Sequence, residues 1–273
     1  MRKLALILLL ALPAVAQVRY PQASPHAVLT QSVGTTDVTI DYHRPGVKGR
    51  QVWGGLVPYD KVWRTGANEA TMITFSDDVT IDGKPLPKGT YSLHTIPGRS
   101  EWTIIFNKTA KQWGSFSYKQ EEDALRVNVK PHAAAMTEWM EFDVPAVSAD
   151  NATIELRWEK LAVPFTVGTG TTAKTLAAAR EAVKNAKPDD AATPYRAANF
   201  AYQAGEMADA RAWLDQSIKA KETASNLYLR AQMEAKAGKS ADAVKSATAA
   251  LALVGDNKEF GGEIQKSIND WKK

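Results

Sequence analysis

The apolar pattern of this chain changes its period near residue 170, and this change constrains the fold more than any other feature. Before it, Val38, Ile40 and Tyr42 alternate with polar residues, the period-two pattern of a strand with one buried face. Short β-branched or aromatic runs follow at regular spacing, separated by turn residues such as Pro97 and Gly98. After it, alanine, lysine and glutamate dominate and the β-branched runs disappear. The pattern predicts a mainly β domain followed by an α-helical region.

The spacing of the short strands favours an antiparallel sandwich or a jelly-roll-like arrangement, because no helical segment interrupts them. A closed barrel has the same sequence pattern, so the sequence does not separate the two. The GTGTT run at residues 168–172 reads as a linker. We therefore expect a β domain over residues 17–168 and helical hairpins over residues 169–273.

The helical region contains an internal repeat. Residues 195–218 align without a gap on residues 228–251, with an offset of 33 that is close to the ~34 residues of tetratricopeptide hairpins. Two hairpins are fewer than a solenoid needs to bury a continuous face. The tail is thus either a docking element for a protein partner or a helical appendage. The matched small residues are Ala198 with Ala231, where helices approach closely, and Gly205 with Gly238, where each hairpin turns.

The first residues, MRKLALILLLALPAVAQ, have the three parts of a secretory signal peptide. Arg2 and Lys3 precede an apolar run at residues 4–12, and small residues end at Ala16, where we expect cleavage. The mature protein should be periplasmic or secreted. Without Arg2 and Lys3 the chain has 32 basic against 30 acidic residues, a near balance that gives no indication of nucleic-acid binding. No later segment is apolar enough to suggest a membrane span.

Standard catalytic and metal-binding signatures are missing from the sequence. The chain has no cysteine, which excludes disulfides, thiolate metal sites and a cysteine nucleophile. Its four histidines show no close-spaced metal pattern, and no serine-nucleophile or phosphate-loop motif occurs. We therefore predict no metal and no cofactor. The pattern favours a binding protein over an enzyme without deciding the question.

One stretch, residues 42–71, is dense in cations, tryptophans, glycine and proline. Arginine and lysine donate to carboxylates, phosphates or sugar hydroxyls, and tryptophan offers a flat apolar face. Polar groups converging among aromatic rings are typical of a binding pocket. The sequence predicts a site between Arg50 and Glu69 for a small molecule, a carbohydrate or a peptide. The residues expected to bind are Lys48, Arg50, Trp53, Trp63, Arg64, Asn68, Glu69 and His94.

Three other interpretations remain open from the sequence. The arginines, paired with Glu69 or Asp60, equally suit a structural clamp that fixes an irregular loop. A hydrolase acting on envelope or extracellular material would use Glu69 or Asp41 with a histidine, either His43 or His94. A third interpretation makes the β domain structural and assigns assembly to the helical tail.

The motifs in this stretch also carry a family resemblance. The run YHRPGVKGRQVWGGLVPYDKVWRTGANEATMITFSDDVTIDGKPLPKGTYSLHTIPGRSEWTIIFNK resembles the bacterial secreted family called domain of unknown function 2911, as do WGSFSYKQEEDALRVNVKP and the IELRWEK strand. The resemblance covers roughly residues 22–167. It implies an exported β-rich domain, and it implies no catalytic residue. Its most specific segments are KGR (48–50), WG (53–54), WRTGANE (63–69) and GTYSLHTIP (89–97).

Overall fold

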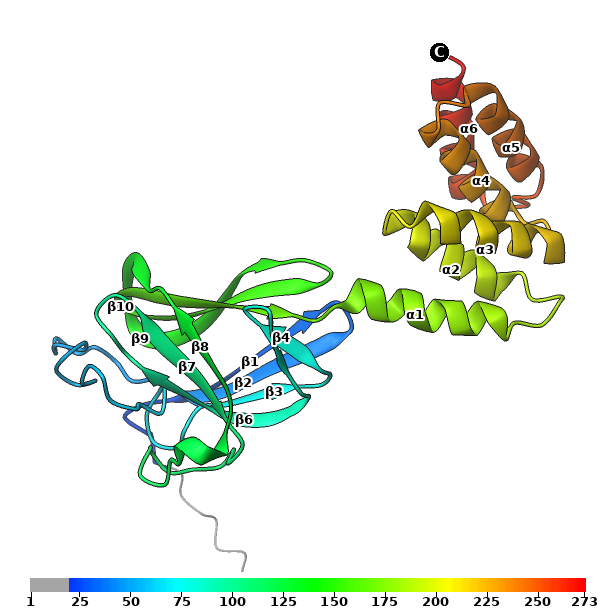
Figure 1. The fold of residues 1–273 in the computed structure, drawn as a ribbon. Coiled ribbons are helices and arrows are strands. Elements are labelled where there is room, and N and C mark those ends of the chain that lie inside the picture. The colour runs from blue at the N-terminus through cyan, green and yellow to red at the C-terminus, as the bar shows by residue number, and fades with distance from the viewer. Residues whose placement is uncertain (1–19) are drawn as a thin grey trace, which may run out of the picture. The chain divides into compact units, whose positions relative to one another are not determined.

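The computed structural model describes residues 20–273, so the expected signal peptide at residues 1–16 lies outside the described residues. The chain divides into a β unit and a helical unit, which are treated separately (Figure 1). The β unit comprises residues up to Ser32, Asp37–Ala146 and Thr153–Val167. The helical unit comprises Gly168–Lys273 with two short hairpin ends, Val33–Thr36 and Val147–Ala152.

Two antiparallel sheets form the β unit. The first has six strands in the order β1-β2-β3-β6-β7-β8, and the second has four in the order β5-β4-β10-β9. A single 3₁₀ turn, Gln120–Glu122, precedes β8. The strands are β1 (His26–Val33), β2 (Thr36–His43), β3 (Met72–Phe75), β4 (Val79–Ile81), β5 (Lys84–Leu86), β6 (Gly89–Ile96), β7 (Trp102–Asn107), β8 (Asp123–Val129), β9 (His132–Val147) and β10 (Asn151–Gly168).

The sheets pack through the side chains that alternate inward along each strand. The ring of Phe106 on β7 lies 6.0 Å from that of Phe165 on β10, and Tyr42 on β2 lies 5.0 Å from Phe142 on β9. Because the two sheets keep separate strand orders, the arrangement is a sandwich and not a closed barrel. The predicted fold class, an antiparallel β domain followed by helices, is confirmed.

The outer face of the six-stranded sheet is partly covered by residues 108–119. On β6, Ser92 and His94 alternate with inward-facing residues and therefore point to this outer face. The covering segment reaches both of them: Gln112 Nε2 donates to Ser92 Oγ at 3.2 Å, and the Tyr118 ring lies 5.1 Å from the His94 ring. This cover bounds one of the two pockets described below.

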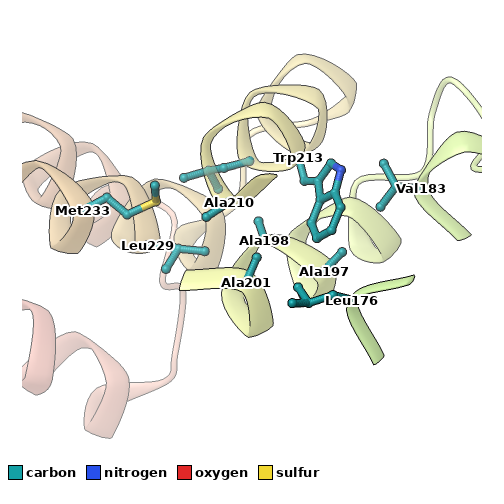
Figure 2. Close-up of a cluster of buried hydrophobic side chains, with 10 residues drawn as sticks. Leu176, Val183, Ala197, Ala198, Ala201, Ala210, Trp213, Leu229 and Met233 are labelled. Carbon is teal, nitrogen blue, oxygen red and sulfur yellow. The ribbon is translucent and has the colours of Figure 1, made fainter. Parts of the chain in front are cut away.

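Six helices follow in the helical unit, and the described residues contain no helix with the length and apolar character that a membrane span requires. Figure 2 shows the first of two hydrophobic clusters, in which Trp213 packs among small alanines of α2 and apolar residues of α1. The second cluster joins α4, α5 and α6 around Tyr228 and Ile264. The helices are α1 (Thr171–Lys184), α2 (Ala192–Gln203), α3 (Met207–Ala220), α4 (Ala224–Lys236), α5 (Ser240–Ala252) and α6 (Lys258–Trp271).

The start of α1 is capped from outside the helix. Asp150, in the β9–β10 turn, accepts the backbone N–H and the hydroxyl of Thr172 at 2.7 Å each. These two hydrogen bonds lower the pKa of Asp150. A carboxylate at a helix N-terminus satisfies a free N–H group and complements the helix dipole. These hydrogen bonds to Thr172 explain why the β9–β10 turn groups with the helical unit.

Candidate functional site

The backbone of the segment 63–71 is held firmly by hydrogen bonds to neighbouring strands and loops. Trp63 exchanges both backbone hydrogen bonds with Thr95 on β6, at 2.8 and 2.9 Å. Thr65 and Asn68 have positive φ angles, 55° and 57°, which are uncommon for residues with a Cβ. The hydroxyl of Thr71 donates to the Thr65 carbonyl at 2.6 Å and helps hold this conformation. A rigid, strained segment of this kind is often found at binding sites.

Four tryptophans cluster behind this segment, and two of them are predicted site residues. The Trp63 ring stacks on the Trp158 ring with centroids 5.9 Å apart, and its Nε1 donates to the Gly66 carbonyl at 3.1 Å. Trp53 packs edge-on against Trp63, Trp102 and Trp158 at 4.9–6.0 Å. The indole rings thus contribute mainly to the core, although the edge of Trp63 lines the pocket described next.

A pocket of about 330 Å³, here called the arginine pocket, opens in front of the tryptophan cluster. It contains two arginines, and no Asp or Glu of the described chain lines it. Arg50 uses part of its guanidinium on the carbonyls of Gly46 and Val47, at 2.6 and 3.1 Å. The lining residues are Ser24, Pro45, Arg50, Leu56, Val57, Trp63, Arg64, Gly66, Ala67, Asn68 and Trp158.

Of the two arginines in the arginine pocket, Arg64 has the less well satisfied guanidinium. Its Nε is buried without a hydrogen-bond partner, and within residues 20–273 its guanidinium forms no ion pair. Burial alone lowers the pKa of Arg64, since no neighbouring charge offsets it. A half-buried cation without an anionic partner is costly for the protein and favourable for an incoming anion.

A second pocket of about 440 Å³ lies on the outer face of the six-stranded sheet. It receives side chains from β1, β2 and β3, from the segment after Asn68 and from the covering loop. Backbone pairing holds that segment and the loop together, because Ala70 N–H donates to the Gln112 carbonyl at 2.9 Å and Gly114 N–H donates to the Asn68 carbonyl at 3.1 Å. We call it the histidine–carboxylate pocket; its lining residues are His26, Asp41, His43, Glu69, Met72, Lys111, Gln112 and Trp113.

Each histidine of this pocket faces a carboxylate. His26 Nε2 lies 2.8 Å from Asp41 Oδ1, His43 Nδ1 lies 3.5 Å from Glu69 Oε2, and the two imidazole rings are 5.2 Å apart. Burial lowers the pKa of His43 and is the largest cause; Glu69 and Asp41 raise this pKa and His26 lowers it, and the net direction is downward. His43 is therefore a neutral imidazole at pH 7. In the described residues no three His, Asp or Glu side chains form a group suited to hold a metal ion.

The structure therefore separates the predicted site residues. Arg50, Trp63, Arg64 and Asn68 line the arginine pocket, whereas Glu69 lines the histidine–carboxylate pocket. Lys48 is exposed over the Trp139 ring, 5.4 Å from its centroid, and lines neither pocket.

His94 is fully buried under Tyr118 and lines neither pocket. Neither of its ring nitrogens has a hydrogen-bond partner among residues 20–273, and burial lowers its pKa to about 4. Of the acid–base residues considered from the sequence, the structure brings together Asp41, His43 and Glu69 and leaves His94 two strands away from β2.

Sequence reasoning missed several lining residues. His26 enters the histidine–carboxylate pocket only because β1 pairs beside β2, and Gln112 and Trp113 enter because their loop folds back over the sheet. Trp158 reaches the arginine pocket from β10. The sequence signal for this loop was the pair of large aromatic residues Trp113 and Phe116. Both are exposed in the structure, and exposed apolar patches often mark binding sites.

A family model for proteins of unknown function, DUF2911, matches residues 24–167. The chain belongs to this family. The matched range contains every residue that lines either pocket and ends just before Gly168, where the main segment of the helical unit begins. Searches of curated proteins and of solved structures find no match.

Proposed function

We propose that the β unit of this DUF2911 protein is a binding module whose arginine pocket takes a small organic anion, with a carboxylate or phosphate group on Arg64. The single observation that carries this proposal is the half-buried Arg64 guanidinium, which, in the part of the chain that the structure describes, lacks an anionic partner and lies in a pocket without acidic residues. Arginine presents a planar fork of donors that matches both anionic groups. Leu56 and Trp63 supply apolar surface for the rest of the ligand.

Calorimetric titration with mono- and dicarboxylates and with sugar phosphates tests the proposal. We expect at least one anion to bind, and Arg64→Gln to weaken its binding by about 10-fold or more, because a charge-assisted pair is lost. Arg99→Gln is the matched control, since Arg99 is an exposed arginine of the same unit that lies over the Tyr59 ring. The absence of binding by any anion, or equal binding by wild type and Arg64→Gln, contradicts the proposal.

A hydrolytic role has weaker support. The histidine–carboxylate pocket holds Asp41, His43 and Glu69 together, which gives a general base and its orienting carboxylate. None of its described lining residues is a serine, threonine or tyrosine, so the lining of this pocket offers no hydroxyl nucleophile. Binding therefore accounts for more of the geometry than hydrolysis does.

The helical unit is proposed as a tetratricopeptide-like docking element for a protein partner. The repeat places Gly205 and Gly238 after α2 and α4, both with positive φ, and it places Ala198 and Ala231 at fully buried positions. Removing residues 171–273 tests the idea: a partner captured by the full chain should be lost by the truncated chain. Capture by both forms contradicts it.

Export and the domain boundaries 17–168 and 169–273 complete the proposal. Export is supported by the signal-peptide pattern that ends at Ala16. The boundary is supported by the compact β unit, which extends to Val167, and by the helical unit, whose main segment begins at Gly168. Sequencing the N-terminus of protein from the periplasmic or extracellular fraction should give Gln17 as the first residue, whereas an intact Met1 contradicts cleavage.

A further inference from the structure

The walls of the histidine–carboxylate pocket present mainly hydrogen-bond acceptors. We propose that this pocket is a second binding site, independent of the arginine pocket, and that it takes a primary ammonium group carried on an apolar body. Three features carry the inference: an amide oxygen left without a partner, an imbalance of charge, and an exposed tryptophan ring at the edge of the pocket.

The amide oxygen belongs to Gln112, whose side chain is 7% exposed. Its Nε2 donates to Ser92 Oγ, to Asn107 Oδ1 and to the Thr109 carbonyl, at 2.8–3.3 Å. This fixes the orientation of the amide, because a flipped group would set its oxygen against two other acceptors. Gln112 is one of the residues that line the pocket, and its Oε1 is buried and has no partner in the described chain. A buried acceptor without a partner favours a ligand that donates a hydrogen bond, and an ammonium group has three N–H donors.

The other polar groups of the pocket have the same character. Neutral His43 turns Nδ1 toward Glu69 and leaves Nε2 without a partner in the described part of the chain, while Asp41 uses one carboxylate oxygen on His26. Asp41 and Glu69 contribute two negative charges, and Lys111 contributes one positive charge. Lys111 is exposed and forms no ion pair with either carboxylate within residues 20–273, so it does not neutralise them locally.

An apolar wall completes the pocket. Trp113 is 63% exposed, and Met72 is the other apolar residue of the lining. The face of a tryptophan ring attracts a cation within about 6 Å, and its apolar surface packs against a ligand body. A volume of about 440 Å³ suits a small amine such as an aralkylamine.

Calorimetric titration of the full chain with benzylamine, and with benzyl alcohol as its neutral counterpart, tests the proposal. We expect benzylamine to bind and benzyl alcohol to bind at least about 10-fold more weakly, because only the amine pairs with the carboxylates. Glu69→Gln should weaken benzylamine binding about 5-fold or more, and Lys111→Gln should strengthen it, because it removes a like charge. Opposite effects of two exposed substitutions are not produced by a folding defect.

Three outcomes overturn the proposal: no binding of benzylamine, equal affinity for both compounds, or an affinity unchanged by Glu69→Gln. Arg64→Gln should leave benzylamine binding unchanged, since Arg64 lines the other pocket. Organic anions, in turn, should bind Glu69→Gln as they bind the wild type. Failure of the amine site is therefore distinguishable from failure of the anion site.

Discussion

Glu69 places its carboxylate 3.5 Å from Nδ1 of His43, and it forms no ion pair with Arg64 of the same segment. The clamp interpretation expected the arginines of this stretch to pair with Glu69 or Asp60. Backbone hydrogen bonds fix the segment instead, and the two side chains line different pockets. One strained stretch of backbone therefore serves a cationic pocket and an acceptor-rich pocket at the same time.

The first prediction concerns the stability cost of Arg64. A half-buried cation without a partner stabilises little, so Arg64→Gln should leave the free energy of unfolding unchanged or raise it by up to about 1 kcal/mol. Arg126→Gln should lower it by about 1–3 kcal/mol, because Arg126 bonds to Asp123 and Tyr118, and Asp123 is largely buried. Urea denaturation measures both. A large loss in Arg64→Gln would show that the fold depends on this cation.

The second prediction concerns the tryptophan cluster. Trp158 is 1% exposed and contacts both Trp53 and Trp63, so Trp158→Ala should destabilise the β unit by about 3–5 kcal/mol. Trp53→Phe should cost much less, because Trp53 Nε1 is buried without a partner in the described chain and its removal deletes an unsatisfied donor. Denaturant midpoints at constant m-value give the comparison. Equal losses would mean that the ring volume of Trp53 outweighs its polar atom.

The third prediction concerns the pH dependence of stability. Burial lowers the pKa of His94 from 6.5 to about 4. The unfolded chain therefore binds a proton at a pH where the folded chain does not, and stability is lost as the pH falls from 6.5 toward 4. At pH values well below 4, the total loss in the free energy of unfolding reaches about 3 kcal/mol. His94→Leu should flatten this part of the stability curve.

Comparison of the stability curves of the wild type and His94→Leu isolates the contribution of His94 from those of all other groups. His132→Leu controls for the exchange of a histidine for a leucine, since the His132 side chain is 52% exposed. Parallel curves for the wild type and His94→Leu would contradict the prediction.

Much of the fold followed from local chemistry. Alternation at Val38, Ile40 and Tyr42 gave β2, and the repeated glycines gave the turns after α2 and α4, where Gly205 and Gly238 have φ angles of 84° and 76°. These features depend on neighbours in sequence. The choice of a sandwich over a barrel depended on which strands pair, and pairing joins residues far apart in the chain.

The site was less predictable because its chemistry is assembled across strands. The density of cations and tryptophans located the segment that lines the arginine pocket, but not the pairing of His26 with Asp41 across β1 and β2. His94 resembled a site residue by type and motif. Its burial under Tyr118 depends on a loop that folds back from later in the chain, and no sequence spacing predicts that contact.

The last prediction concerns the pH dependence of amine binding. Neutral His43 accepts a hydrogen bond, whereas protonated His43 repels an ammonium ligand. Burial lowers the pKa of His43 below 6.5, and the charged or titratable groups that face its pocket are Glu69, His26, Asp41 and Lys111. Affinity for benzylamine, which stays protonated throughout, should therefore fall as the pH decreases from about 7.5 to about 5.5.

His43→Gln tests the assignment of this pH dependence to His43. The glutamine keeps an acceptor but does not titrate, so its affinity should decline less over the same range, by the share that His43 contributes. A decline as steep as that of the wild type would contradict the assignment to His43.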